Sequence, residues 1–102
     1  MAASNHLAEK LKALAHPVRL NIAALLANQG EDMYLNQIAN NLKISRALAK
    51  IHLKKLERGG IVRSRVVLVE GEAKALRYYT LNDFDIQISP ELLKKGGVNN
   101  KL

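Results

Sequence analysis

The spacing of apolar residues divides the first part of the chain into helices. Leu7, Leu11 and Leu14 recur three or four positions apart, which predicts a helix over residues 4–14 with one apolar stripe. Proline suits the first position of a helix, so the proline that follows predicts a second helix over residues 17–28. Apolar residues cover much of the circumference of this second helix, so we expect it to be central and largely buried.

Two further helices are expected close together. Residues 33–34 form a short extended piece, and the apolar pattern after them predicts a third helix over residues 35–42. After a tight connection, Ser45 is a suitable N-cap for a fourth helix, which should run to Arg58 and stop at a double glycine. The expected inward-facing residues of the fourth helix are Leu48, Ala49, Leu53 and Leu56.

Beyond the double glycine the apolar pattern changes from helical to extended. Residues 61–69 and 75–81 are rich in valine and tyrosine and are separated by a Glu-Gly-Glu turn, which predicts a β-hairpin. Ser-Pro-Glu at residues 89–91 then opens a brief final helix. We expect residues 4–95 to form a single domain and residues 96–102 to be a disordered tail.

The fold class predicted by this order of elements is mainly α with a small β-hairpin. Two short helices joined by a tight turn form a helix-turn-helix, and a hairpin directly after them makes a winged helix-turn-helix. The full expected order is two helices, a short extended piece, two more helices, two hairpin strands and a final helix.

The positive charge of the chain is concentrated on the predicted motif. The formal net charge is +7, and residues 43–65 hold eight basic residues and one acidic residue, whereas the remaining positions hold eight of each. A concentrated basic stretch on a neutral body is typical of a surface that binds a polyanion. The alternative is an ordinary solvated helix face.

A basic, serine-capped fourth helix predicts binding to double-stranded DNA in the major groove. Arg46 is the best candidate for a base reader because a guanidinium can bridge the two acceptors of guanine, whereas Ala47 and Ile51 suit thymine methyl groups. Lys50 could read a base or neutralise a phosphate. The expected DNA contacts are Ser45, Arg46, Ala47, Lys50, Ile51, Lys54, Lys55, Arg58, Arg63, Arg65, Lys74 and Arg77.

Basic residues continue from the fourth helix into the hairpin. Those expected to clamp phosphates, which position a protein without specifying a sequence, are Lys54, Lys55, Arg58, Arg63 and Arg65. The hairpin tip is less suited to DNA because phosphates repel Glu70 and Glu72, and only Lys74 and Arg77 offset these acids. The sequence leaves open whether the tip contacts DNA.

Composition excludes or disfavours several other functions. The chain has no cysteine, so disulfides, thiolate metal sites and cysteine nucleophiles are excluded. No apolar run approaches the roughly 18 to 20 residues of a membrane span, and nothing resembles a signal peptide, so a cytoplasmic protein is expected. His6, His16 and His52 lie on separate elements, and no glycine-rich phosphate loop is present. We therefore expect neither an enzyme nor a bound cofactor.

Three segments together resemble the ArsR-type winged helix-turn-helix transcriptional repressors. The segments are KALAHPVRLNIAALL, LNQIANNLKISRALAKIHLKKLERGGIVRSR and ALRYYTL, and the similarity spans residues 7–81. The resemblance implies a homodimeric repressor that binds a palindromic operator, with the first and last helices paired across a two-fold axis. The implied interface residues are Leu7, Leu11, Leu14, Leu92 and Leu93.

The chain departs from the metal-sensing members of the resembled family. Those proteins carry cysteines near the start of the third helix, or histidine and aspartate clusters on the last helix. The corresponding stretches here read EDMYLNQIA and SPELLKK, so no metal sensing is expected.

Two other binding roles remain open for the predicted fold. A winged helix can act as a protein-interaction module of a transcription assembly, because fold alone does not fix function. RNA binding is the other, although the shortage of aromatic residues argues against stacking on single strands.

Overall fold

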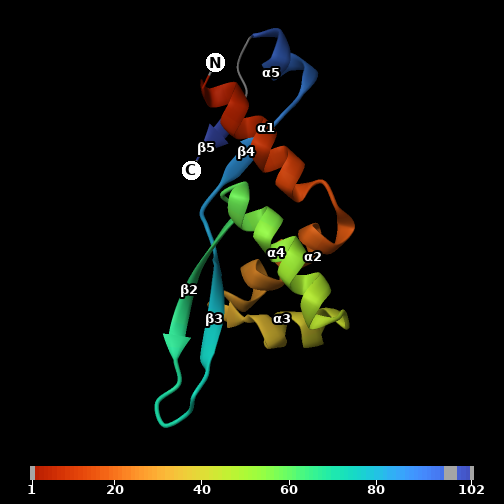
Figure 1. Cartoon of the computed structure of the whole chain (residues 1–102). Helices are drawn as coiled ribbons and strands as arrows, with labels where there is room; N and C mark the ends of the chain where they lie inside the picture. Colours follow the sequence, from red (N-terminus) through yellow and green to blue (C-terminus); the bar gives the residue numbers. More distant parts are fainter. Residues whose placement is uncertain (1, 96–98, 102) are drawn as a thin grey trace.

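The structure, a computed structural model of the chain, describes residues 2–95 and 99–101 (Figure 1). The helices are α1 (Ala2–Leu14), α2 (Pro17–Gln29), α3 (Leu35–Leu42), α4 (Arg46–Arg58) and α5 (Pro90–Lys94). The strands are β1 (Met33–Tyr34), β2 (Val62–Leu68), β3 (Ala75–Leu81), β4 (Asp85–Gln87) and β5 (Asn99–Lys101). This confirms the predicted mainly helical fold with a small antiparallel hairpin.

The hairpin forms a three-stranded antiparallel sheet with the short extended piece predicted after α2. The strand order is β1-β3-β2, with Met33 opposite Tyr79 and Val62 opposite Leu81. The far end of the hairpin projects away from the helices as a wing, whereas α1, β4 and α5 lie at the opposite end of the molecule (Figure 1). The helix pair α3–α4 lies between these two ends.

An aliphatic core joins the helices to the base of the wing. Its largest fully buried side chains come from α2, α3, α4, β2 and the link before β2; they are Ile22, Ile38, Leu53, Leu56, Ile61 and Val62. Burying an aliphatic side chain of this size contributes about 1.5–3 kcal/mol relative to leaving it exposed. The core therefore fixes α4 on the body of the protein along its inner face.

Helix ends fall where the sequence places capping residues. Pro17 is the first residue of α2, and His16 Nδ1 accepts a hydrogen bond of 3.1 Å from the Val18 N–H. Gly30 ends α2 with a φ of 70°, a conformation that favours glycine. Ser45 Oγ accepts from the Leu48 N–H at 3.0 Å, which confirms the predicted N-cap of α4.

Three details of the helices differ from the sequence predictions. Helix α1 begins at Ala2, before the predicted start. On α2 Leu20 is exposed and Arg19 is buried, because the Arg19 guanidinium donates to the Ala13 carbonyl at the end of α1. On α4 Leu48 is exposed and His52 lies inward with Ala49, Leu53 and Leu56.

The C-terminal end differs from the expected disordered tail over residues 96–102. Asn99–Lys101 form β5, which pairs antiparallel with β4 in the register Asp85 to Lys101. The pairing gives backbone partners to β4, a strand that the sequence analysis did not predict. Residues 96–98 and 102 lie outside the described residues.

Candidate nucleic-acid interface

The turn between α3 and α4 sets the direction of the fourth helix. Lys43 ends α3 with a φ of 55°, and its N–H bonds to the carbonyls of Ala39 and Asn40. Two residues later Ser45 caps α4. Both orphaned helix ends are therefore satisfied within a very short connection, which holds the two helices in the helix-turn-helix arrangement.

All twelve residues predicted to contact DNA are exposed in the structure. On α4 these residues form the outward face of the helix, and Ala49, Leu53 and Leu56 form its buried inner face. The inward and outward faces therefore divide largely as the sequence predicts. Exposure alone does not bring these residues together, and the structure separates them into groups.

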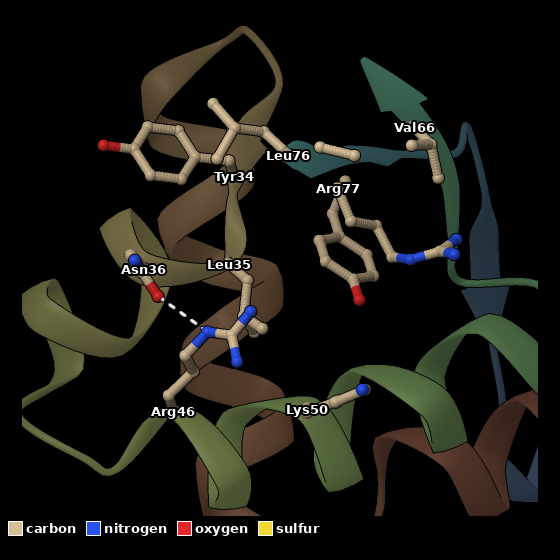
Figure 2. A pocket seen from close by; sticks show the side chains of 10 residues that line it. Tyr34, Leu35, Asn36, Arg46, Lys50, Val66, Leu76 and Arg77 are labelled. Carbon is tan, nitrogen blue, oxygen red and sulfur yellow. Dashed lines mark hydrogen bonds between the residues drawn. The ribbon is translucent and has the colours of Figure 1, made fainter. Parts of the chain in front are cut away.

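One group faces a cavity between α3, α4 and the wing. The cavity measures about 230 Å³ and is lined by Tyr34, Leu35, Asn36, Arg46, Lys50, Val66, Ala75, Leu76, Arg77 and Tyr79. Figure 2 shows Arg46 and Lys50 on α4, with Arg77 across from them on the wing. Three cations from α4 and β3 therefore line one cavity, and no carboxylate is among its lining residues.

Two of these cations are oriented by neutral side chains. Arg46 Nε donates to Asn36 Oδ1 at 3.0 Å, the bond drawn dashed in Figure 2. Arg77 Nη1 donates to Ser64 Oγ at 3.0 Å. Ser64 Oγ in turn donates to Glu57 Oε2 at 2.8 Å, so one carboxylate lies a single hydroxyl away from Arg77. Neither guanidinium forms a direct ion pair within the described part of the chain, so the lining of the cavity keeps a net positive charge.

Sequence reasoning missed Asn36. It lies ten positions before Arg46, and nothing in the spacing marks the two residues as partners across the helix-turn-helix. The only available signal was its place near the start of α3, beside the turn that brings α4 back towards it.

Tyr79 forms part of the floor of the same cavity. Burial raises the pKa of Tyr79, against the opposite effect of the nearby Arg77 charge. The phenol therefore remains neutral at physiological pH and can donate or accept a hydrogen bond without adding negative charge.

Arg63 and Arg65 lie on the other face of the wing from Arg77. Successive residues of a strand point to opposite faces, and the register places Arg77 opposite Val66 and Tyr78 opposite Arg65. Arg63 Nη1 donates to Asn82 Oδ1 at 2.6 Å, whereas Arg65 forms an ion pair with Asp32 and covers the Tyr78 ring. These two arginines do not join the α4 cavity.

The wing tip combines charge neutralisation with an exposed apolar residue. Lys74 Nζ lies 3.3 Å from Glu72 Oε2, and this ion pair neutralises the charge of Lys74. Leu68 is 79% exposed close to the turn. The tip therefore presents little net positive charge to a phosphate backbone.

The C-terminal half of α4 packs against α1 and α2, and its Glu57 also accepts a hydrogen bond from Ser64 of β2. Its Lys55 and Arg58 line a second cavity of about 400 Å³ together with Glu9, Lys12, Ala13, Arg19 and Gly59. Several of the basic residues lie in the last turns of α1 and α4, where cations complement the negative end of a helix dipole. Helix stabilisation accounts for much of this second basic group.

His52 connects α4 to α2 through a contact with Arg19, which also lines that second cavity. Its Nδ1 lies 3.3 Å from Arg19 Nη1, and its ring centre lies 4.4 Å from that of His16. Burial lowers the pKa of His52, and the charges of His16, Arg19 and Lys55 lower it further. His52 therefore packs as a neutral ring against Arg19 and His16.

The residues implied at a dimer interface divide into two kinds. Leu7 is buried and Leu14 is half-buried within the chain, where Leu14 packs against the core. Leu11 and Leu93 are exposed, and Leu92 is half-buried. Only part of the predicted apolar stripe is therefore available to a second subunit.

The described residues show neither a cluster of metal ligands nor a helix suited to a membrane. Over residues 2–95 and 99–101, no group of three or more histidine, aspartate or glutamate side chains is placed to hold a metal ion. In the same part of the chain, no helix is long and apolar enough to cross a membrane.

The chain is similar to known regulators along most of its length. A family model described as a helix-turn-helix domain matches residues 14–65. An uncharacterized HTH-type transcriptional regulator of Methanocaldococcus jannaschii is 36% identical over 84 residues, which cover 82% of this chain and 84% of the relative.

Solved structures match the fold over a similar range. The homodimeric winged helix-turn-helix DNA-binding domain Mb0332 of Mycobacterium bovis, described as a possible ArsR-family regulator, matches with a TM-score of 0.65 and 31% identity. That match covers 78% of this chain and 67% of Mb0332. Reduced HlyU of Vibrio cholerae matches with a TM-score of 0.65 and 26% identity, covering 80% and 78% of the two chains.

Proposed function

Because the chain belongs to the ArsR-type winged helix-turn-helix regulators, we propose that it binds double-stranded DNA sequence-specifically and regulates transcription as a repressor. The main support for the proposal is α4, whose outward face presents exposed cations while its apolar inner face is buried in the core. The proposal includes no catalytic activity, and a role at DNA agrees with the cytoplasmic location expected from the sequence.

The outward face of α4 suits the major groove in both charge and shape. Exposed apolar residues and cations alternate along the helix, in the order Arg46, Ala47, Lys50, Ile51 and Lys54. Apolar side chains can contact thymine methyl groups, while the lysines neutralise phosphates beside the groove. The N-terminal half of α4 is therefore proposed to read the operator.

We further propose that the protein acts as a homodimer on a palindromic operator. Mb0332 is homodimeric, and the exposed Leu11 and Leu93 provide apolar surface on α1 and α5. Two-fold symmetry would place two α4 helices about 34–36 Å apart, one turn of DNA. Sedimentation of Leu11→Glu is expected to show monomers, whereas Leu20→Glu, a matched change on the exposed face of α2, should leave the dimer intact.

DNA binding is tested by comparing the duplex upstream of the protein's own coding sequence with a random duplex of equal length. We expect a preference of about a thousandfold, and an affinity that falls with salt by a slope of about 0.9 per phosphate contacted. Lys50→Glu, in the N-terminal half of α4, should weaken binding strongly. Lys95→Glu makes the same charge change at the end of α5, far from α4, and should have little effect.

Two outcomes would contradict the proposal. Equal, salt-sensitive binding to both duplexes would argue against sequence specificity for this operator. Weak binding to both, indifferent to salt, would favour the alternative role as a winged-helix protein-interaction module.

A further inference from the structure

The cavity between α3, α4 and the wing has the charge of an anion site. Arg46, Lys50 and Arg77 line it from two elements, and none of the three forms an ion pair within the described part of the chain. Like charges that share one cavity repel one another, and an anion bound among them reduces that repulsion. The cavity also adjoins the N-terminus of α4, where the helix dipole favours negative charge.

The hydrogen bonds around the cavity leave donors for a ligand. A guanidinium carries five N–H donors in a planar fork. Arg46 uses one of them on Asn36, and Arg77 uses one on Ser64. Within the residues that the structure describes, no other acceptor bonds to either guanidinium, so both keep donors for an oxygen-rich ligand.

The size and walls of the cavity restrict that ligand to a small group. Its volume of about 230 Å³ is below the range of about 300–1,000 Å³ that is typical of sites for drug-sized molecules. Leu35, Val66 and Leu76 form apolar walls that offer nothing to a larger polar molecule. A compact anion with several acceptor oxygens fits best.

We propose that this cavity binds one phosphate group through Arg46, Lys50 and Arg77, with Asn36 as the residue that positions Arg46. The inference rests on the proposed function, under which the group is a backbone phosphate of the operator held between α4 and the wing. It assigns Arg46 a phosphate contact in place of the base contact predicted from the sequence. Guanidinium forks suit phosphate oxygens because they can bind two at once.

Asn36 is well placed for this positioning role. Its side-chain oxygen accepts from Nε, which leaves the terminal nitrogens of Arg46 directed towards the cavity (Figure 2). Asn36→Ala removes this restraint without changing the charge of the site. Asn36→Asp keeps an oxygen that can accept from Arg46 Nε but adds a negative charge to the cavity lining. That charge should repel phosphate and weaken its binding.

The first test uses inorganic phosphate and needs no DNA. Side-chain resonances of Arg46, Arg77 and Asn36 are followed by NMR during titration with phosphate, against chloride at equal ionic strength. Saturable shifts specific to phosphate are expected, weakened in Asn36→Ala and abolished in Asn36→Asp and Arg77→Ala. Arg65→Ala removes the same charge from the opposite face of the wing and should bind phosphate like the unaltered protein.

The second test identifies the source of the phosphate. Single neutral methylphosphonates are placed along the operator duplex. We expect one position in each half-site whose substitution weakens the unaltered protein at least tenfold but leaves Arg46→Ala almost unaffected, because the two changes remove the same contact. Arg46→Ala should also weaken all duplexes evenly and lower the salt slope by about 0.9.

The outcomes separate this inference from the proposed function. Phosphate-specific shifts without any DNA binding would support the site while contradicting the regulator, and would point to a free phosphate-bearing ligand. Specific DNA binding with neither phosphate shifts nor a coupled methylphosphonate position would overturn the site while leaving the regulator intact. Loss of preference for one base in Arg46→Ala would also overturn it, in favour of base reading.

Discussion

The two halves of α4 differ in what their polar residues do, although both are rich in basic residues. In the N-terminal half, Arg46 and Lys50 face a cavity without a carboxylate. In the C-terminal half, His52 packs against Arg19, and Gly59 just beyond the helix touches α1. Basic composition is therefore a poor guide to function within this helix: one half is built to hold an anion, and the other to hold the helix on the protein.

The comparison predicts that stability depends on the C-terminal half. Leu56→Ala removes a fully buried side chain from the core, and we expect a loss of about 2–5 kcal/mol in the free energy of unfolding. Ile51→Ala truncates an exposed residue of the same helix and should change stability by less than about 0.5 kcal/mol while weakening DNA binding. Urea denaturation of the two variants measures both changes. Equal losses in the free energy of unfolding would mean that the buried and exposed faces of α4 contribute alike to stability.

Close contact between α4 and α1 gives the next largest effect. A Cβ added at Gly59 would lie 2.4 Å from Ala13 Cβ, so Gly59→Ala forces the two helices apart. Overpacking of this kind typically costs about 1–3 kcal/mol, which thermal or urea unfolding would detect. The double variant Gly59→Ala, Ala13→Gly should recover part of the loss; no recovery would mean that the clash lies elsewhere.

The cap at the other end of α4 makes a smaller contribution. Ser45→Ala removes the oxygen that accepts from the Leu48 N–H, and loss of such a cap costs about 0.5–2 kcal/mol. Ser45→Asp keeps an acceptor and should retain stability, but its charge should weaken DNA binding. In Ser45→Asp, urea denaturation should therefore show unchanged stability while fluorescence anisotropy shows weaker DNA binding. A fall in stability that accompanies the fall in affinity in both variants would contradict this account.

His52 should make stability depend on pH over a narrow window. Its folded pKa lies below the ordinary value of 6.5, so the unfolded chain binds a proton more readily than the folded chain does. The contribution of neutral His52 is therefore complete above pH 6.5 and declines as the pH falls towards the folded pKa. His52→Gln should flatten the unfolding free energy between those values, and an unchanged pH profile would count against burial of the neutral ring.

The sequence predicts α3, α4 and the hairpin well because local signals mark their ends. Ser45 caps α4, the double glycine ends it, and the period then changes from helical to extended. The burial of Arg19 on α2 was harder to predict. Arg19 is buried because it reaches carbonyls at the end of α1, a contact that no local pattern reveals.

The candidate site was only partly predictable for a related physical reason. Exposure of the basic residues follows from helix and strand periodicity, but their grouping depends on contacts between distant elements. Asn36 orients Arg46 across the turn, and Asp32 pairs with Arg65 although 33 positions separate them. The sequence therefore identifies a basic surface, whereas the structure separates the cations that line one cavity from Arg65, which is paired with Asp32.

The difference between the two halves of α4 can be measured most directly by NMR of the protein with and without its operator duplex. The account predicts large shifts for the backbone amides of Arg46, Ala47, Lys50 and Ile51, and small shifts for those of Leu53 and Leu56. Shifts confined to α1 and α5, or spread evenly over α4, would contradict the claim that its N-terminal half carries the DNA-binding surface.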